Sequence, residues 1–291
     1  MSMHDPTVTK RLAQAEALSG RAMRHADAGD LDAALPLLRQ AEQEIRPLVE
    51  ILPAARLDLA VVLNDLALVL AWLGRPAEAL TPLREAIALH RARLAAPPPI
   101  DAGTRHAAGP ADVRFLLANS LDSLGTRLAA LGRHREAATA QREAIKHYRD
   151  AFAAARTDVR AWELARALNN LSIRCADLEE HEEALEASRE AVDLYHQVPS
   201  ADPEQLSGLT HATANLALRL ARLDHRAEAP GVTARAVELI ARLPEPHPRS
   251  QLAALVDSLT WLAWYLRRTG HPLRARSATR TARALRRRLA G

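Results

Sequence analysis

The sequence predicts an all-α fold, a right-handed superhelical solenoid of about six antiparallel helical hairpins. The main observation is an alanine that recurs six times, at spacings of 45, 58, 47, 45 and 46 residues. Another alanine follows each of them by seven residues, and a small residue precedes each by twelve. Small residues at fixed offsets let two helix backbones approach closely, so each repeat is predicted as one hairpin. We name the repeated residues the anchor alanines: Ala34, Ala79, Ala137, Ala184, Ala229 and Ala275.

Each hairpin is predicted as two amphipathic helices around a tight turn. In the third hairpin, Leu121, Leu124 and Leu128 fall on one stripe of the first helix. Gly132 then ends that helix, because glycine tolerates positive φ. Glycine holds the same turn position in the first, second and sixth hairpins, as Gly29, Gly74 and Gly270. The predicted hairpins span about residues 10–50, 55–96, 111–155, 158–197, 204–242 and 249–290 of one domain, 1–291.

Prolines mark where the helices begin and where they are interrupted. Pro76 and Pro272 open second helices, where the missing N–H costs nothing. Pro230 lies inside the expected second helix of the fifth hairpin, so we expect that helix to start late or to kink. The segment 95–110 reads AAPPPIDAGTRHAAGP and accounts for the one long spacing. Its proline and glycine content predicts a flexible surface loop between the second and third hairpins.

Composition indicates where the protein resides. Apolar residues make up 48% of the chain, which is enough for a continuous core, and aromatic residues only 3%. A single cysteine, Cys175, excludes an internal disulfide framework and fits a reducing cytosol. The first ten residues lack the apolar core of a signal peptide, and the longest apolar stretch is too short to span a bilayer. We therefore expect a cytoplasmic protein that does not contact membranes.

The repeated motif resembles the tetratricopeptide repeat, whose signature is a large residue, Leu-Gly, an aromatic residue and then alanine. The third hairpin carries it as Leu121, Leu124-Gly125, Leu128 and Ala137. The fourth hairpin carries it as Leu168, Leu171-Ser172, Cys175 and Ala184. The longer period is similar to the extended repeats of actinobacterial and kinesin-light-chain-like proteins. This resemblance implies a concave face, lined by the first helix of each hairpin, that binds extended peptides or partner helices.

Positions on that face follow from a rotation of about 100° per residue along each first helix. They form the predicted partner-binding site. Its members are Asn64, Asp65, Leu68, Trp72, Asp122, Thr126, Arg166, Asn169, Asn170, Ile173, His211, Asn215, Arg222, Trp261, Trp264 and Arg268.

Within this face a ladder of Asn and Asp allows two interpretations. These residues are mediocre in helix interiors, so another interaction should account for them. They either hydrogen-bond neighbouring helices or clamp the backbone of a bound peptide. The tryptophans also allow two interpretations: they are either interface anchors or caps of the core at an end of the solenoid. An arginine series, Arg24, Arg127, Arg174 and Arg219, either reaches the groove or pairs with carboxylates in solvent.

The chain lacks the motifs of common enzymes. It has no phosphate-binding glycine loop, no HExxH and no GxSxG. Four of the twelve histidines lie just after hairpin turns, one per hairpin and too far apart to share a metal: His134, His181, His225 and His271. Cys175 falls on a core stripe. We expect no catalytic residues, no metal and no cofactor.

The sequence therefore predicts a non-enzymatic scaffold or adaptor, regulatory or complex-assembling, that binds a protein or extended peptide on its concave face. One alternative is a nucleic-acid-binding protein, because the last hairpin is rich in arginine, although a solvated cap also explains those charges. Another is a structural protein that assembles through its ends. The sequence leaves the oligomeric state open.

Overall fold

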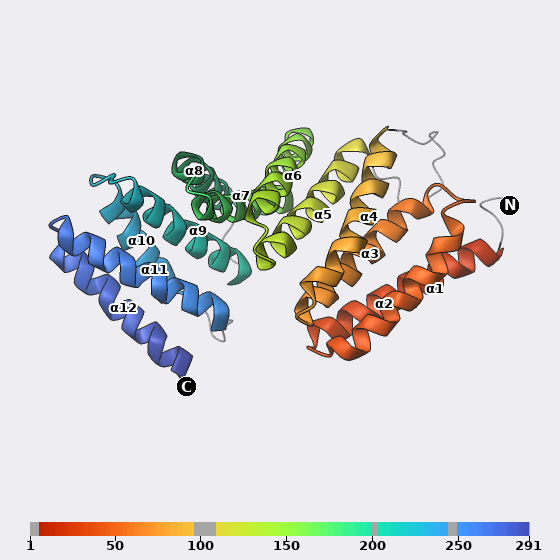
Figure 1. The fold of residues 1–291 in the computed structure, drawn as a ribbon, viewed down its shortest axis with the longest axis horizontal. Coiled ribbons are helices and arrows are strands. Elements are labelled where there is room, and N and C mark those ends of the chain that lie inside the picture. Colours follow the sequence, from red (N-terminus) through yellow and green to blue (C-terminus); the bar gives the residue numbers. More distant parts are fainter. Residues whose placement is uncertain (1–5, 96–108, 199–202, 244–248, 291) are drawn as a thin grey trace. The chain divides into compact units, whose positions relative to one another are not determined.

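The computed structural model describes residues 6–95, 109–198, 203–243 and 249–290, and these form helical hairpins (Figure 1). The chain divides into two compact units, residues 1–155 and 156–291. The first unit contains three hairpins, and each pairs a first helix with a second helix. These are α1 (Pro6–Asp27) with α2 (Leu31–Ile45), α3 (Ala55–Trp72) with α4 (Pro76–Ala95), and α5 (Pro110–Ala130) with α6 (His134–Ala154). A short 3₁₀ helix, Arg46–Leu48, follows α2.

The second unit repeats this plan. Its hairpins are α7 (Asp158–Asp177) with α8 (His181–Gln197), α9 (Pro203–Arg222) with α10 (Ala229–Ala241), and α11 (Arg249–Arg268) with α12 (Pro272–Ala290). The described residues contain no β-strand. The predicted all-α class and its six hairpins are confirmed. The predicted loop 95–110 falls almost entirely outside the described residues.

The anchor alanines lie where the two helices of each hairpin meet. All six have no exposed surface, and the alanines seven residues later are likewise buried. The small residues twelve positions earlier are buried as well, including Ala67 and Ser172. At Gly125 a β-carbon would come within 3.1 Å of the Ala137 carbonyl oxygen, so these two backbones approach more closely than a side chain allows. The offset pattern of the sequence is therefore a pattern of helix–helix contacts.

The hairpin turns share one backbone conformation. The residue five positions before each anchor has positive φ, between 59° and 84°. Four of these residues are the predicted glycines, Gly29, Gly74, Gly132 and Gly270. In the fourth and fifth hairpins the position holds Glu179 and Asp224, with φ of 64° and 59°. The turn geometry thus persists where glycine is absent.

Pro230 has the predicted effect on the fifth hairpin. The other second helices begin three residues before their anchor alanine, but α10 begins at Ala229 itself, with Pro230 in its first turn. Proline is tolerated there because first-turn N–H groups have no partner within the helix. The helix starts late rather than kinking.

Packing within each unit follows the chain order. In the first unit α1 contacts α3 and α3 contacts α5, while α2 packs against α3 and α4 against α5. The second unit has the corresponding contacts of α7 with α9, α8 with α9, and α9 with α11. The first helices therefore share one face of each unit, which we call the first-helix face. No helix among the described residues is long and apolar enough to cross a bilayer.

Candidate peptide-binding surfaces

The polar ladder on the first-helix face connects consecutive first helices. Ser19 Oγ donates to Asp65 Oδ2 at 2.8 Å, which joins α1 to α3. Asn215 Nδ2 donates to Asn169 Oδ1 at 2.9 Å and joins α9 to α7 at the equivalent offsets. Asn64 Nδ2 donates to Ser120 Oγ, also at 2.9 Å, and joins α3 to α5. These bonds support the helix-to-helix interpretation of the ladder, and the peptide clamp stays a prediction.

Burial makes some of these ladder groups costly. Asp65 is mostly buried, and desolvation raises the pKa of its carboxyl, opposed by the hydrogen bond from Ser19. The Oδ1 atom of Asn64 is buried and has no hydrogen-bond partner. Burying these polar side chains therefore costs free energy, and the hydrogen bond to the neighbouring hairpin offsets part of that cost.

Asp122 does not belong on the first-helix face, and that prediction is wrong. Its side chain is only 1% exposed, and it accepts a short hydrogen bond from Gln141 Nε2 of α6. The reason is Gly125, above which the Gln141 side chain lies: a β-carbon there would sit 3.0 Å from Gln141 Oε1. Because glycine leaves that space open, Gln141 reaches Asp122 inside the hairpin.

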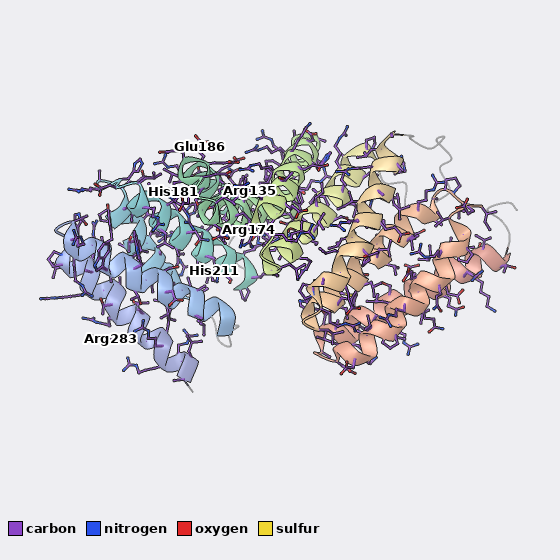
Figure 2. The ribbon with its side chains drawn as sticks, in the orientation of Figure 1. Arg135, Arg174, His181, Glu186, His211 and Arg283 are labelled. Atoms are coloured by element: carbon purple, nitrogen blue, oxygen red, sulfur yellow. The ribbon has the colours of Figure 1, made fainter. Side chains whose placement is uncertain are left out.

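Two further predicted residues interact within their own helix. Thr126 Oγ1 donates to the carbonyl of Asp122 at 3.0 Å. Arg166 pairs with Glu163 at 2.5 Å, and its guanidinium lies 5.8 Å from the Trp162 ring centroid. Asn170, Ile173 and His211 are half-buried on α7 and α9, and Arg222 is exposed. Figure 2 shows the described side chains, with Arg174 on α7 and His211 on α9 labelled.

An apolar stripe on α3 remains open to solvent. Val61, Leu68 and Trp72 recur at i, i+7 and i+11, so they share one side of the helix. Val61 is 42% exposed and Trp72 is 47% exposed, while Leu68 is half-buried. The sequence analysis singled out Leu68 and Trp72 for this face, and the structure places them there together with Val61.

The last first helix, α11, carries an aromatic cluster. The rings of Trp261 and Tyr265 stack at 5.9 Å, and Trp261 lies 6.0 Å from Trp264. Tyr265 is buried, but Trp264 is 53% exposed and the Arg268 guanidinium lies 5.1 Å from its ring centroid. Trp261 and Tyr265 therefore pack into the hairpin, whereas Trp264 and Arg268 form an exposed pair.

Three members of the arginine series, Arg127, Arg174 and Arg219, are half-buried, whereas Arg24 is exposed. Desolvation lowers the pKa of Arg127, which Asp122 partly opposes, and it lowers the pKa of Arg219, which Asp177 partly opposes. Arg174 lies 3.6 Å from Asp177. These groups are half-buried cations along the first helices rather than fully solvated pairs.

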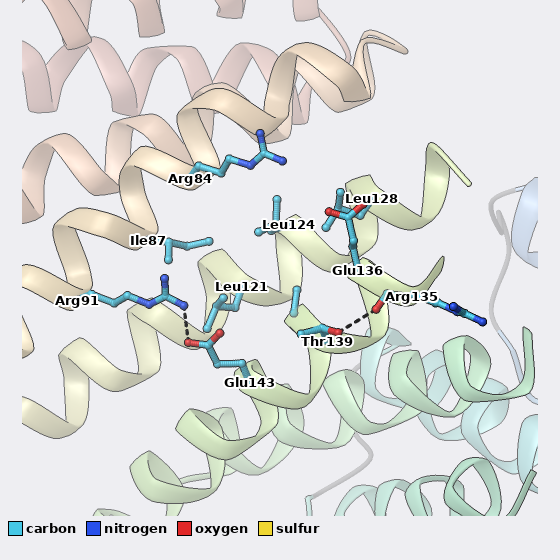
Figure 3. Close-up of a pocket in the computed structure, with 11 residues that line it drawn as sticks. Arg84, Ile87, Arg91, Leu121, Leu124, Leu128, Arg135, Glu136, Thr139 and Glu143 are labelled. Atoms are coloured by element: carbon cyan, nitrogen blue, oxygen red, sulfur yellow. Dashed lines mark hydrogen bonds and ion pairs between the residues drawn. The ribbon is translucent and has the colours of Figure 1, made fainter. Parts of the chain in front are cut away.

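The second helices of the first unit carry a groove that the sequence analysis missed. Its volume is about 440 Å³, and it lies between α4 and α6 over the leucine stripe of α5 (Figure 3). Leu121, Leu124 and Leu128 form its floor, Arg84 and Arg91 line its α4 side, and α6 completes it. Arg91 pairs with Glu143 across the groove at 2.6 Å. An equivalent ion pair joins Arg46 to Glu85 one hairpin earlier, at 2.7 Å.

A signal for these pairs exists in the sequence. Both arginines lie twelve residues after an anchor alanine, and both glutamates lie six residues after the next one. Extending the offset comparison from the first helices to the second helices would have found them.

One group among the described residues has the spacing of potential metal ligands. The Cys175 sulfur and carboxylate oxygens of Glu180 and Glu183 lie within 4.8 Å of one another. Each of these residues already takes part in other interactions, and exposed acidic groups commonly lie this close without an ion. We assign no metal to them.

Comparison with known families decides what the hairpins are. The model of the tetratricopeptide repeat family matches residues 59–99, 117–154 and 164–198. The second, third and fourth hairpins carry tetratricopeptide repeats. The matched segments coincide with the second, third and fourth hairpins, so the resemblance first drawn from the spacing is confirmed.

Several solved structures share this fold. BtubC (BKLC) from P. vanneervenii is 18% identical, with a TM-score of 0.62, and the match covers 90% of this chain and 92% of BtubC. PilF of Pseudomonas aeruginosa is 17% identical, with a TM-score of 0.56, over 92% of this chain and 90% of PilF. A Rap protein complexed with Competence and Sporulation Factor is 15% identical, with a TM-score of 0.52, over 96% of this chain and 76% of that one. Among curated protein sequences, none matches.

Proposed function

We propose that this tetratricopeptide repeat protein is a non-enzymatic scaffold or adaptor that binds a protein or extended peptide on its first-helix face, in a regulatory or complex-assembling role in the cytoplasm. The observation that carries the proposal is the exposed apolar stripe of α3. A tryptophan and a valine that are each more than two-fifths exposed on one helix side are typical of an interaction surface. The exposed Trp264–Arg268 pair on α11 gives the second unit a corresponding surface.

The hydrogen-bonded ladder supports binding without change of shape. Its bonds tie α1 to α3, α3 to α5 and α7 to α9, so the first helices of each unit are held in register before a ligand arrives. A preordered receptor loses little conformational entropy on binding, and the extended ligand loses more. The Rap protein, which has this fold, was solved in complex with a factor, which fits the same mode of action.

A displayed library of random 12-residue peptides, selected on the full chain, tests this proposal. We expect selected peptides to lose at least about tenfold in affinity on the Trp72→Ala or Trp264→Ala variant, because truncating a central aromatic residue removes a large part of interface energy. Leu273→Ala is the matched control, since Leu273 is 75% exposed on α12, away from the first-helix face. Selected peptides that bind all three variants as tightly as the unmodified chain would refute the proposal.

A second candidate is nucleic-acid binding through α12. That helix contains no acidic residue, and Arg276, Arg280, Arg283 and Arg287 recur along one of its sides, all exposed. Arg283 is labelled on this helix in Figure 2. None of the four has a carboxylate partner in the described part of the chain. A fluorescein-labelled random-sequence DNA strand should then bind with a steep salt dependence, weakened by Arg280→Glu and Arg283→Glu. Absence of binding at low salt would remove this candidate.

A further inference from the structure

We propose that the groove between α4 and α6 is a second docking site, which takes a peptide segment that carries a carboxylate beside a branched aliphatic side chain. This site goes beyond the first-helix face of the proposed function, because its walls are second helices.

Arginine follows five of the six anchor alanines by five residues, as Arg39, Arg84, Arg142, Arg189 and Arg280. The glutamate directly before the next anchor alanine is its natural partner, as Glu78, Glu136 and Glu228. In the second unit this ion pair forms. Arg189 lies 2.7 Å from Glu228 and so joins α8 to the turn before α10. The equivalent pair Arg84 and Glu136 forms no hydrogen bond or ion pair.

Arg84 and Glu136 form no ion pair because another arginine, Arg133, binds Glu136. Arg133 grips both carboxylate oxygens of Glu136, with Nε and Nη2 distances of 2.7 and 2.6 Å. This grip is the largest cause of the lowered pKa of Glu136, to which Arg84 adds only a longer-range contribution. In the second unit the position equivalent to Arg133 holds His225, and the adjacent Arg226 binds Asp224 of the turn, which leaves Glu228 available.

Arg84 is consequently an exposed cation at the edge of an apolar floor. Arg91, the other arginine of α4 in the groove, is already paired with Glu143 (Figure 3). Glu136 and Glu143 also line the groove, but Arg133 binds the first and Arg91 the second, so a carboxylate from a ligand would be the direct partner of Arg84. Below it lie Leu121 and half-buried Leu124, which suit a branched aliphatic side chain. Arg-to-carboxylate contacts beside an apolar pocket are the usual elements of acidic-motif recognition.

The peptide library selected on the full chain distinguishes this site from the first-helix face. We expect one class of selected peptides to place Asp or Glu next to Leu, Ile or Val, and to lose about tenfold or more in affinity on Arg84→Gln, as expected for a lost charge-assisted bond. The same class should bind Trp72→Ala and Trp264→Ala unchanged. Arg39→Gln is the matched control, since Arg39 holds the same offset but does not line the groove.

Arg133→Gln sharpens the test, because Arg133 does not line the groove. Releasing Glu136 lets it pair with Arg84 as Glu228 does with Arg189, so affinity should fall although no lining residue has changed. Selected peptides that lose affinity only on Trp72→Ala or Trp264→Ala would support the first-helix face and overturn the groove. Acidic–aliphatic peptides that bind Arg84→Gln as tightly as the unmodified chain, or a selection that yields no binders, would overturn it as well.

Discussion

The two units build the same hairpin with different residues at two equivalent positions. Five residues before the anchor alanine, the first unit has glycine in all three turns, whereas the second unit has Glu179, Asp224 and Gly270. Eleven residues after the anchor, the first unit has Ile45, His90 and Tyr148, and the second has Tyr195 and Ile240 in its first two hairpins. All five of these later residues are buried.

The comparison shows which residues set the geometry. A left-handed backbone costs a residue with a β-carbon about 1–2 kcal/mol, yet Glu179 and Asp224 adopt it. The anchor alanines, by contrast, are completely buried in both units. The contact between the two helices therefore sets the backbone conformation of the turn, and glycine lowers the free-energy cost of adopting it.

The largest expected effect comes from overfilling that contact. Ala79→Leu in the first unit and Ala184→Leu in the second should each lower the free energy of unfolding by about 3 kcal/mol, because three extra carbons enter a fully packed helix contact. Urea denaturation followed by circular dichroism measures both. The matched controls Ala77→Leu and Glu186→Leu lie on the exposed sides of the same helices and should change it by less than about 0.5 kcal/mol. Equal stability of anchor and control variants would show that the offset pattern is not a packing pattern.

His90 should give the first unit an acid sensitivity that its apolar counterparts do not provide. Neither ring nitrogen has a hydrogen-bond partner, and burial lowers the pKa of His90 to about 4. The folded state then binds fewer protons than the unfolded state, whose histidine has a pKa of 6.5. The stability is fully present above pH 6.5 and falls as the pH drops toward 4, by up to about 3 kcal/mol.

Urea denaturation at several pH values between 7.5 and 4.5 checks this. His90→Ile, which installs the residue found at Ile45 and Ile240, should remove that part of the pH dependence. His196→Gln is the control, because His196 is exposed on α8 and its replacement should leave the profile unchanged. A profile that His90→Ile does not flatten would mean that another group titrates.

Exchanging the turn residues between the units should produce smaller and opposite effects. Gly74→Ala should cost about 1 kcal/mol, since alanine must adopt a φ of 73°. Glu179→Gly should gain up to about 1 kcal/mol for the same reason. Asp224→Gly should gain less, because Asp224 also binds Arg226 at 2.9 Å and accepts from the Tyr265 hydroxyl at 3.3 Å. Thermal unfolding of the three variants ranks them, and a loss of stability in Glu179→Gly would contradict the comparison.

The sequence predicted the hairpins because close helix contacts require small residues at fixed offsets, a constraint visible at Ala34 or Ala275 without any structure. It predicted the turn at Gly132 for a similar reason. The motif departures were harder to interpret. Gln141 and Ser188 look like lost core residues, but Gln141 reaches Asp122 over Gly125, and the hydroxyl of Ser188 lies 2.5 Å from that of Ser172. Each departure is compensated by a partner sixteen or nineteen residues away, which no single position reveals.

The candidate sites were predicted only in part, for a physical reason. A helical wheel gives the side of a helix, and the two tryptophans that it placed on the predicted face, Trp72 and Trp264, are both exposed. It does not show which of two polar side chains binds a partner that both could reach. Arg133 takes Glu136 and leaves Arg84 open, while in the second unit Arg226 takes Asp224 and leaves Glu228 to Arg189. That competition depends on distances, which the sequence does not give.

The smallest expected effect concerns the ion pairs that join consecutive second helices. Glu42 and Glu85 both bind Arg46, at 2.5 and 2.7 Å, and together they raise the pKa of this guanidinium, Glu85 contributing most. Arg46 and Glu85 are partly exposed, at 48% and 35%, so solvent screening limits their ion pair, and Glu85→Gln should cost less than about 1 kcal/mol. Glu228→Gln breaks the Arg189 pair of the second unit and should cost a similar amount.

The salt dependence of these stability losses distinguishes an ion-pair effect from an effect of side-chain packing. Urea denaturation at 0.05 and 1 M NaCl should show that the loss in Glu85→Gln and in Glu228→Gln disappears at high salt, because an ionic strength of 1 M reduces the Debye length to about 3 Å. A loss that persists in 1 M NaCl would mean that these glutamates act through the packing of their side chains. The hairpins of each unit would then be joined by side-chain packing and by the hydrogen-bonded ladder, and an open Arg84 would no longer indicate a missing ionic partner.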